Sequence, residues 1–149
     1  MITPDQEQYI FKFLSIYDMD KVEKSLDAMS VSLDEYVKEA LFRDAVVSYM
    51  RPFSGNRGIH IKRGLRLPVE IIPTELEAAH KEVEEIRDQL FAHNDLSYQN
   101  PSFGPGTGFS IKGYNKVFCQ HLHDPLRQLA RTVKHQLEKD TVDFIENGL

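Results

Sequence analysis

The chain contains very little cysteine. Cys119 is the single cysteine among 149 residues, and one thiol cannot form a disulfide within the chain. A zinc site needs several cysteine or histidine ligands close together, and His121 and His123 lack neighbours of that kind. We therefore expect turn positions for these two histidines, and we expect neither a metal site nor a cofactor.

The sequence also lacks a long apolar run. Neither residues 1–10 nor any later segment has the uninterrupted apolar stretch of a signal peptide or a membrane-spanning helix. No internal repeat is visible, and the length fits one domain with a single core. We therefore expect one domain over residues 1–149, located in the reducing cytoplasm and without membrane contact.

Positive charge is in deficit as well. Eighteen Lys and Arg residues face 23 Asp and Glu residues, and the net charge of -5 argues against nucleic-acid binding by the whole surface. The cations are nevertheless dense in residues 51–72, where Glu70 is the single acid. Such a segment can hold an anion locally, although a solvated loop has the same composition. Its cations are Arg51, Arg57, Lys62, Arg63 and Arg66.

Capping residues and apolar spacing predict two helices in the first third of the chain. Pro4 and the capping pair of Thr3 and Gln6 begin the first helix, which we expect to break or bend near residues 18–20 and to resume over residues 22–26. Ser32 and Glu35 form a second capping pair for a helix that ends before residue 52. The side chains expected to point inward are Tyr9, Ile10, Phe13, Leu14 and Tyr17 in the first helix, and Val37, Ala40, Leu41 and Val47 in the second.

The rest of the chain predicts two more helices, joined by irregular segments. Residues 53–72 form a connector in which residues 59–61 or 69–71 could pair as short strands. Residues 96–115 are rich in Gly, Pro, Ser and Asn and indicate a loop, without the Lys-Ser or Lys-Thr ending of a P-loop, and a brief helix follows over residues 114–121. The apolar stripes are Leu76, Ala79, Val83, Ile86 and Leu90 in a helix over residues 73–94, and Leu126, Leu129, Val133 and Leu137 in a last helix that begins at Asp124 and Pro125. Together these elements predict an all-α antiparallel bundle of four to five helices.

The segment over residues 87–95 carries the strongest functional signal. The stripe of the third helix continues to His93, and Arg87 and Asp88 lie one to two turns before it. Titratable groups at the edge of a core can have shifted pKa values, and a neighbouring arginine can hold an anion. The alternative is structural: His93 would be a hydrogen-bonded core residue, and Arg87 and Asp88 would be solvated helix surface.

The order of Arg87, Asp88 and His93 within a helical bundle resembles the motif of the HEPN superfamily (higher eukaryotes and prokaryotes nucleotide-binding domain). That motif is an arginine, a polar residue and then a histidine a few positions later. The form found here is similar to HEPN proteins of the abortive-infection type, and residues 49–53 resemble a second segment of that group. The resemblance covers these two short segments and the all-helical layout.

The resemblance implies a homodimer that acts as a metal-independent endoribonuclease, in the role of a toxin or phage-defence effector with an antitoxin partner. His93 would be the acid-base group, Arg87 would stabilise charge on the phosphate, and Asp88 would orient either His93 or Arg87. The candidate contacts to an RNA substrate are Arg51, Asn94, Arg57, Lys62, Arg63 and Arg66. The alternative implied by the same family is a non-catalytic dimeric domain for interaction or nucleotide binding.

Helix geometry qualifies how Arg87 and His93 can work together. Six positions along an ideal helix rotate by about 600°, so the two side chains point roughly 120° apart. A cleft between two subunits removes the difficulty, because each subunit then supplies part of a composite site. We therefore expect the third helix to pack at a dimer interface.

Overall fold

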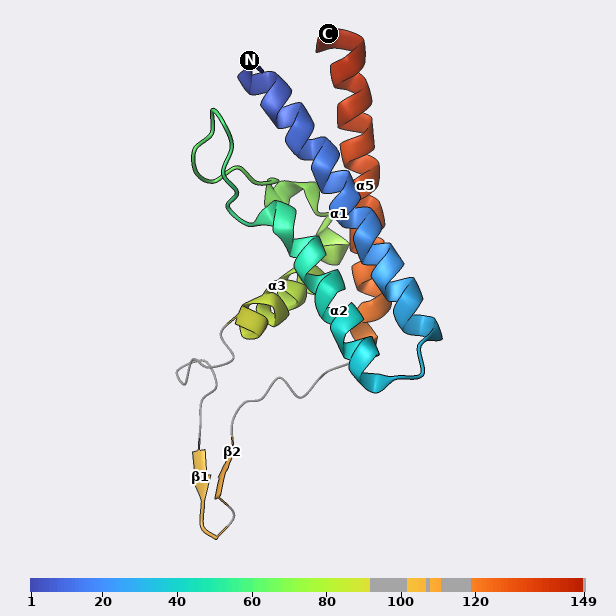
Figure 1. The fold of residues 1–149 in the computed structure, drawn as a ribbon, viewed down its shortest axis with the longest axis vertical. Helices are drawn as coiled ribbons and strands as arrows, with labels where there is room; N and C mark the ends of the chain where they lie inside the picture. Colours follow the sequence, from blue (N-terminus) through green and yellow to red (C-terminus); the bar gives the residue numbers. More distant parts are fainter. Residues whose placement is uncertain (92–101, 107, 111–118, 149) are drawn as a thin grey trace.

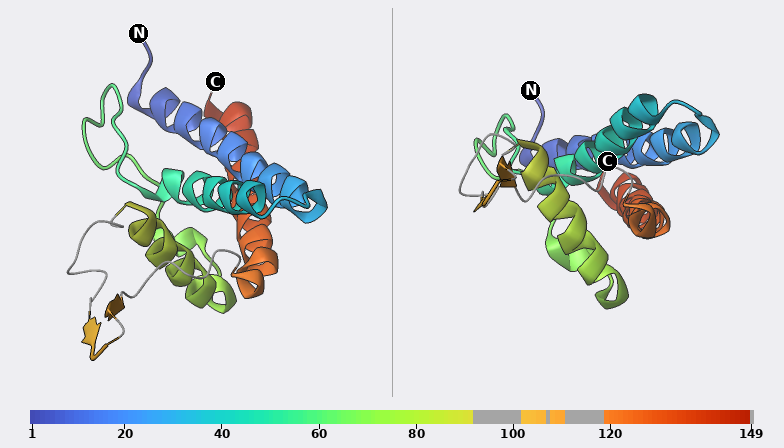
Figure 2. Two further views of the ribbon diagram at one scale, coloured as in Figure 1. Left: turned by 60° about the horizontal axis from the view of Figure 1, so that its bottom comes forward. Right: turned by 90° about the horizontal axis from the view of Figure 1, so that it is seen from below.

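The computed structural model describes residues 1–91, 102–106, 108–110 and 119–148 and confirms the predicted all-α bundle. In Figure 1, α1 lies antiparallel both to α2, which follows it after a short turn, and to α5. The right-hand view of Figure 2 shows α3 crossing α1 and α2 at a steep angle. The long helices are α1 (Pro4–Val31), α2 (Glu35–Met50), α3 (Glu77–Phe91) and α5 (Gln120–Gly148).

Helix α1 is continuous, so the predicted break near residues 18–20 is wrong. The capping box of Thr3 and Gln6 is present, and the helix then runs for 28 residues. The acids that indicated a break have partners on other segments. Asp18 accepts a hydrogen bond from Arg51 at 2.6 Å, and Asp20 accepts one from Lys134 at 2.5 Å. These contacts compensate for the weak helix propensity of the two aspartates.

The five side chains in the first half of α1 that the sequence predicts to point inward are not in the core. The buried stripe begins later, at Ser15, and continues along the second half of the helix through Met19, Val22, Leu26 and Met29. In Figure 1 the first half of α1 extends with the end of α5 beyond α2 and α3, so no other long helix covers it. The exposed fractions are 40% for Ile10, 44% for Phe13, 56% for Leu14 and 60% for Tyr17, and Tyr9 is half-buried.

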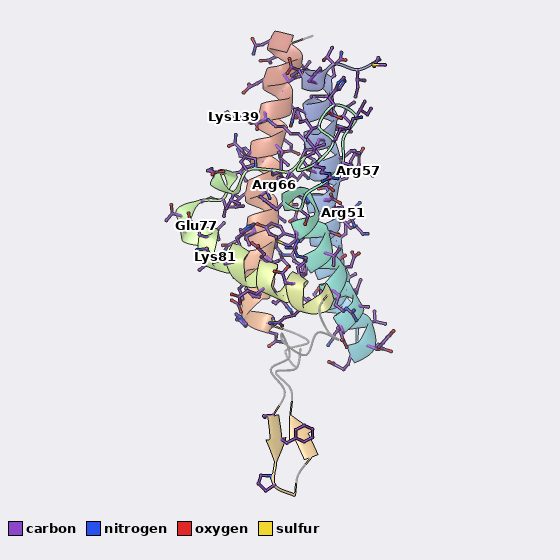
Figure 3. All side chains as sticks on the ribbon, turned by 90° about the vertical axis from the view of Figure 1, so that its left-hand side faces the viewer. Arg51, Arg57, Arg66, Glu77, Lys81 and Lys139 are labelled. Carbon is purple, nitrogen blue, oxygen red and sulfur yellow. The ribbon has the colours of Figure 1, made fainter. Side chains whose placement is uncertain are left out.

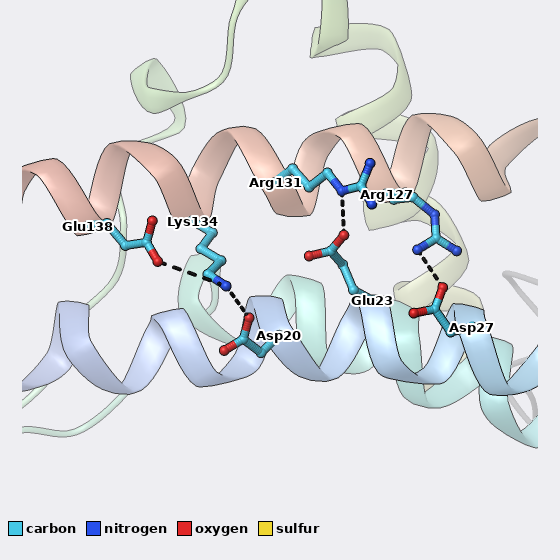
Figure 4. Close-up of polar contacts among 7 residues, drawn as sticks. All are labelled: Asp20, Glu23, Asp27, Arg127, Arg131, Lys134 and Glu138. Atoms are coloured by element: carbon cyan, nitrogen blue, oxygen red, sulfur yellow. Dashed lines mark hydrogen bonds and ion pairs between the residues drawn. The ribbon is translucent and has the colours of Figure 1, made fainter.

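A row of ion pairs fixes the register of α1 against α5 (Figure 4). Lys134 binds Asp20 at 2.5 Å. About one turn nearer the start of α5, Arg131 binds Glu23 at 2.5 Å, and about one turn further Arg127 binds Asp27 at 2.7 Å. The residue numbers rise on one helix as they fall on the other, as antiparallel packing requires. Exposed pairs of this kind contribute about 0–1 kcal/mol each, so their main effect is to select one register.

Helix α2 begins two residues later than the second capping pair predicted. Ser32 ends α1, and the N-cap of α2 is Asp34, whose side chain accepts the backbone N–H of Val37 at 3.1 Å. The inward face is also different: Val37 and Ala40 are exposed, and Leu41 and Val47 are half-buried. The core takes the face with the larger side chains, because these bury more apolar area. That face carries Phe42, Ala45, Val46, Tyr49 and Met50.

The apolar stripes of α3 and α5 are confirmed. Val83 and Ile86 are buried, and Leu76, Ala79 and Leu90 pack against the same core. In α5, each of the four predicted leucine and valine residues is fully buried. The helix begins at Gln120 rather than Asp124, because buried Leu122 extends the stripe by one turn and the helix continues through Pro125. His121 and His123 consequently lie in a helix and not in a turn.

The irregular segments differ in detail from the sequence prediction. Short 3-10 turns occur at Arg51–Phe53, Val69–Ile71 and Thr74–Leu76, so residues 69–71 are not a strand. Residues 59–61 are not a strand either; the connector has one isolated antiparallel bridge, between Asn56 and Leu65. The Gly- and Pro-rich loop contains a small hairpin of β1 (Ser102–Gly104) and β2 (Gly108–Ser110). The brief helix predicted over residues 114–121 lies mostly outside the described residues.

Among the described residues, no helix has a stretch long enough and apolar enough to cross a membrane.

Candidate functional site

A cleft of about 510 Å³ lies where the end of α2, the connector and α3 meet. The connector forms one wall and α3 forms the other. Charged groups from both walls face an apolar floor from the end of α2. The lining residues are Met50, Phe53, Gly64, Arg66, Leu67, Pro68, Val69, Glu70, His80, Glu84 and Arg87.

The contribution of α3 follows from its helical period. His80, Glu84 and Arg87 stand at positions i, i+4 and i+7, which place them within about 60° of one another on one face. This face is adjacent to the apolar stripe that includes Val83 and Ile86. Helix α3 therefore packs into the core with its apolar stripe and lines the cleft with the adjacent polar face.

Arg87 is held in a defined orientation. Its Nη1 donates to Ser54 Oγ at 2.6 Å, and its Nε donates to Asp88 Oδ1 at 2.8 Å. Ser54 Oγ in turn donates to the carbonyl of Met50 at 3.0 Å, so its lone pairs are directed to the guanidinium. The Arg87 side chain is 19% exposed. Of the two residues that the sequence gives Asp88 to orient, His93 and Arg87, Asp88 is in contact with Arg87.

His80 forms the second polar feature of the cleft. Its Nδ1 lies 2.8 Å from the hydroxyl of Tyr49, and its ring packs edge-on against the rings of Tyr49 and Phe53. Both side chains are almost wholly enclosed. Burial lowers the pKa of His80, although Glu84 acts in the opposite direction, and burial raises the pKa of Tyr49 strongly. At neutral pH the pair is therefore an uncharged imidazole and a protonated phenol.

Three of the five cations in residues 51–66 line two separate cavities, and the other two lie on the open surface. Arg66 lines the cleft together with Arg87. Arg51 and Arg57 line a different, more apolar cavity of about 530 Å³ beside α1, and Arg51 is paired with Asp18 and not with the last carbonyls of α2. Figure 3 shows Arg51, Arg57 and Arg66 on the side of the molecule where the connector lies. Lys62 and Arg63 are exposed on the connector itself. His93 and Asn94 lie outside the described residues.

Glu7 of α1 fixes the connector that carries these cations. Its carboxylate accepts the backbone N–H groups of Ile59, His60 and Ile61, the last two at 3.1 Å. Gly58 lies against the same carboxylate, where a Cβ would collide with it. Burial opposes the charged form, but the N–H donors of Ile61, Ile59 and His60 together hold the pKa of Glu7 below its ordinary value.

Replacing Glu7 by Gln is expected to destabilise the fold at neutral pH but not in acid. Because the folded-state pKa of Glu7 lies below its ordinary value of 4.5, its stabilisation is fully present above that value. The stabilisation is lost as the pH falls through the folded-state pKa. The urea midpoints of wild-type protein and the Glu7→Gln variant should therefore differ at pH 7 and converge below pH 4.5. Glu77→Gln, at an exposed position in the first turn of α3, is the control. A difference that stays constant from neutral to acid pH would contradict the assignment.

The chain matches no family model, no curated protein and no solved structure with which it has been compared. Among the described residues, no group of three or more His, Cys, Asp or Glu side chains is arranged to hold a metal ion. The function of the site therefore has to be inferred from the geometry of its residues. Arg87, Arg66 and Asp88 belong to it or border it, and Arg51 and Arg57 lie in the other cavity.

Two residues of the cleft escaped the sequence analysis. Neither His80 nor Glu84 is among the candidate site residues that the sequence predicts. The i, i+4 and i+7 spacing with Arg87 was the available signal, because it predicts a second, polar face on α3. The contact between His80 and Tyr49 had no signal in the sequence, since 31 residues separate the two.

Proposed function

We propose that the protein is a metal-independent endoribonuclease of the HEPN type. The observation that carries the proposal is the arginine of the motif on the wall of the cleft. Arg87 is oriented by Ser54 and Asp88 and shares the cleft with Arg66. Two guanidinium groups at one cavity suit a phosphate, because each can donate to two of its oxygens.

The reaction needs two proton movements and one stabilised charge. The 2′-oxygen of a ribose attacks the adjacent phosphorus and loses its proton, while the bond to the 5′-oxygen breaks and that oxygen gains a proton. The products are a 2′,3′-cyclic phosphate and a 5′-hydroxyl. We assign the proton transfer to His93 and the stabilisation of the phosphorane to Arg87. The exposed connector cations Lys62 and Arg63 would hold the RNA backbone by salt-sensitive phosphate contacts.

We also propose a homodimer, with the exposed face of α1 as its contact. Ile10, Phe13, Leu14 and Tyr17 follow the i, i+3, i+4 and i+7 pattern of one helix face. Such a face is self-complementary about a two-fold axis, and its large side chains are of the kind that form the centres of interfaces. The apolar residues of α3, which the sequence analysis placed at the interface, are already used in the core of the chain.

The proposed biological role is a cytoplasmic toxin or defence effector. A nuclease that cuts cellular RNA has to be restrained while the cell is healthy, so an antitoxin partner is part of this proposal.

The purified protein should cut RNA in the presence of EDTA. The proposed chemistry uses side chains for proton transfer and charge stabilisation, so chelation should leave the rate unchanged. The assay uses single-stranded RNA of mixed sequence together with structured RNA, and it detects new 5′-hydroxyl and 2′,3′-cyclic phosphate ends. DNA of the same sequence is the control, because it lacks the 2′-hydroxyl. Failure to cut any of these RNAs would favour the non-catalytic alternative, in which the bond of Arg87 to Ser54 serves to hold α3 against the connector.

A further inference from the structure

We propose that the cleft is a subsite for one phosphodiester group of the substrate, and that His80 contacts this group alongside Arg66 and Arg87. The inference rests on the proposed function for its substrate class, RNA, but it concerns residues outside the motif. All of them lie on two walls of one cavity of about 510 Å³.

The hydrogen bond to Tyr49 determines which proton His80 can offer. Tyr49 is fully enclosed, so its O–H needs an acceptor within the protein, and His80 Nδ1 is placed 2.8 Å away to serve as one. With Nδ1 accepting, the proton of the neutral ring is on Nε2. His80 is therefore a fixed N–H donor at Nε2, and it can become charged only by protonation of Nδ1, which would remove the acceptor of the Tyr49 hydroxyl.

The donor end of His80 is directed to the charged part of the cleft. Nε2 lies 4.0 Å from Glu84 Oε2, which is beyond hydrogen-bond reach. Glu84 lines the cleft and its side chain is 47% exposed, whereas the His80 side chain is 4% exposed. A buried ring with one nitrogen fixed and the other facing a polar cavity is arranged as a binding group for a ligand in that cavity.

The charges of the walls distinguish between classes of phosphate. Arg66 and Glu70 lie on the connector wall, Glu84 and Arg87 lie on the α3 wall, and Asp88 is paired with Arg87. With His80 neutral, these two cations and three carboxylates carry a net charge of -1. A phosphodiester carries one negative charge and a terminal phosphate carries nearly two, so this net negative charge opposes the terminal phosphate more strongly. The cleft is therefore suited to the internal phosphates of a chain and not to the phosphate at its end.

Binding can be measured without any cleavage by using a deoxydinucleotide that has one internal phosphodiester and no terminal phosphate. Nitrogen NMR of the wild-type protein should show His80 with its proton on Nε2 before the ligand is added. Titration with the deoxydinucleotide should shift the Nε2 resonance and leave Nδ1 as an acceptor. Inorganic phosphate should bind more weakly. A His80 proton on Nδ1, or an Nε2 resonance that does not respond to the deoxydinucleotide, would overturn the proposal.

Variants separate the contact from the packing of the ring. His80→Asn retains a polar group near the position of Nδ1 but removes the Nε2 donor, and it should weaken deoxydinucleotide binding about tenfold or more, the order of a lost hydrogen bond to a charged group. His80→Gln places an amide N–H near the position of Nε2 and should restore part of the affinity. Exposed His135 on α5 supplies the matched control, His135→Asn, which should bind normally.

Arg66→Gln keeps the proposal testable if the buried substitutions prevent folding. Arg66 is exposed, so its replacement should not affect stability, but it should weaken deoxydinucleotide binding about as much as His80→Asn. Lys139→Gln, on α5, is its control. Unchanged binding by Arg66→Gln would overturn the proposal. Because no turnover is involved, a protein that binds the deoxydinucleotide in this way but cuts no RNA would contradict the proposed ribonuclease and leave the subsite standing.

Discussion

Replacing Arg87 by Ala is expected to lower the rate of RNA cleavage by about a hundredfold to a thousandfold, the usual loss when one preorganised charged donor is removed from a transition state. Ser54 and Asp88 orient the guanidinium before substrate arrives, so the wild-type side chain needs no reorganisation when charge develops on the phosphorane. Arg87→Lys retains the charge but not the forked geometry, and it should recover only part of the rate.

His93→Ala should remove most of the cleavage as well, because positioned acid-base transfer contributes about two to four powers of ten in rate. The variant that lacks both Arg87 and His93 should be little slower than either single variant, since residues that act on one transition state are not additive. Rates are measured under single-turnover conditions in EDTA, and thermal unfolding of each variant reports whether the fold is intact.

Arg43→Ala and His135→Ala are matched controls at exposed positions of α2 and α5. Both should cleave RNA at the wild-type rate. Folded Arg87→Ala and His93→Ala proteins that cut as fast as wild type would contradict the assigned roles. Additive losses in the double variant would indicate that the two residues act in separate steps.

The sequence predicted best those parts of the fold that depend on local pattern. The stripe of α3 through Val83 and Ile86 is regular, and one face of the helix is clearly more apolar than the other. The stripe of α5 is equally regular, so both were predicted correctly. In α1 two apolar faces compete: one contains Phe13 and Tyr17, and the other contains Met19 and Val22. Spacing alone does not show which of them the neighbouring helices cover.

The errors elsewhere come from partners that are distant in the chain. The aspartates of α1 indicated a break because Arg51 and Lys134, which bind them, are far away in sequence. The sequence shows the dense positive charge of the connector. It does not show that the Glu7 carboxylate binds the connector backbone, because Glu7 lies in α1, more than 50 residues earlier. The motif singled out Arg87 because Asp88 and His93, the other residues of the motif, lie close to it in the sequence. It could not reveal His80, whose role depends on Tyr49.

Replacing Phe13, Leu14 and Tyr17 together by Ser is expected to convert a dimer into a monomer. These side chains are 44%, 56% and 60% exposed, and they form the centre of the apolar face of α1. Truncating a single residue at the centre of an interface commonly costs 2 kcal/mol or more, so three together should raise the dissociation constant by well over about a hundredfold. Sedimentation velocity across a concentration series measures the change. The monomer should still fold, because the three residues lie outside the core of the chain, but it should unfold below the wild-type temperature, because the stabilisation by the partner subunit is lost.

The control is a second triple variant, in which three exposed apolar side chains near the other end of α1 are replaced. Val31, Leu33 and Tyr36 are 80%, 95% and 80% exposed around the turn into α2, and replacing them by Ser should leave the dimer intact. A wild-type protein that stays monomeric at high micromolar concentration would contradict the proposed dimer. A dimer that persists in the α1 variant would place its interface on another surface. The monomeric variant also tests the composite site, because a cleft completed by two subunits loses most of its RNA cleavage when they separate, whereas a monomer that cuts at the wild-type rate contains the whole site within one chain.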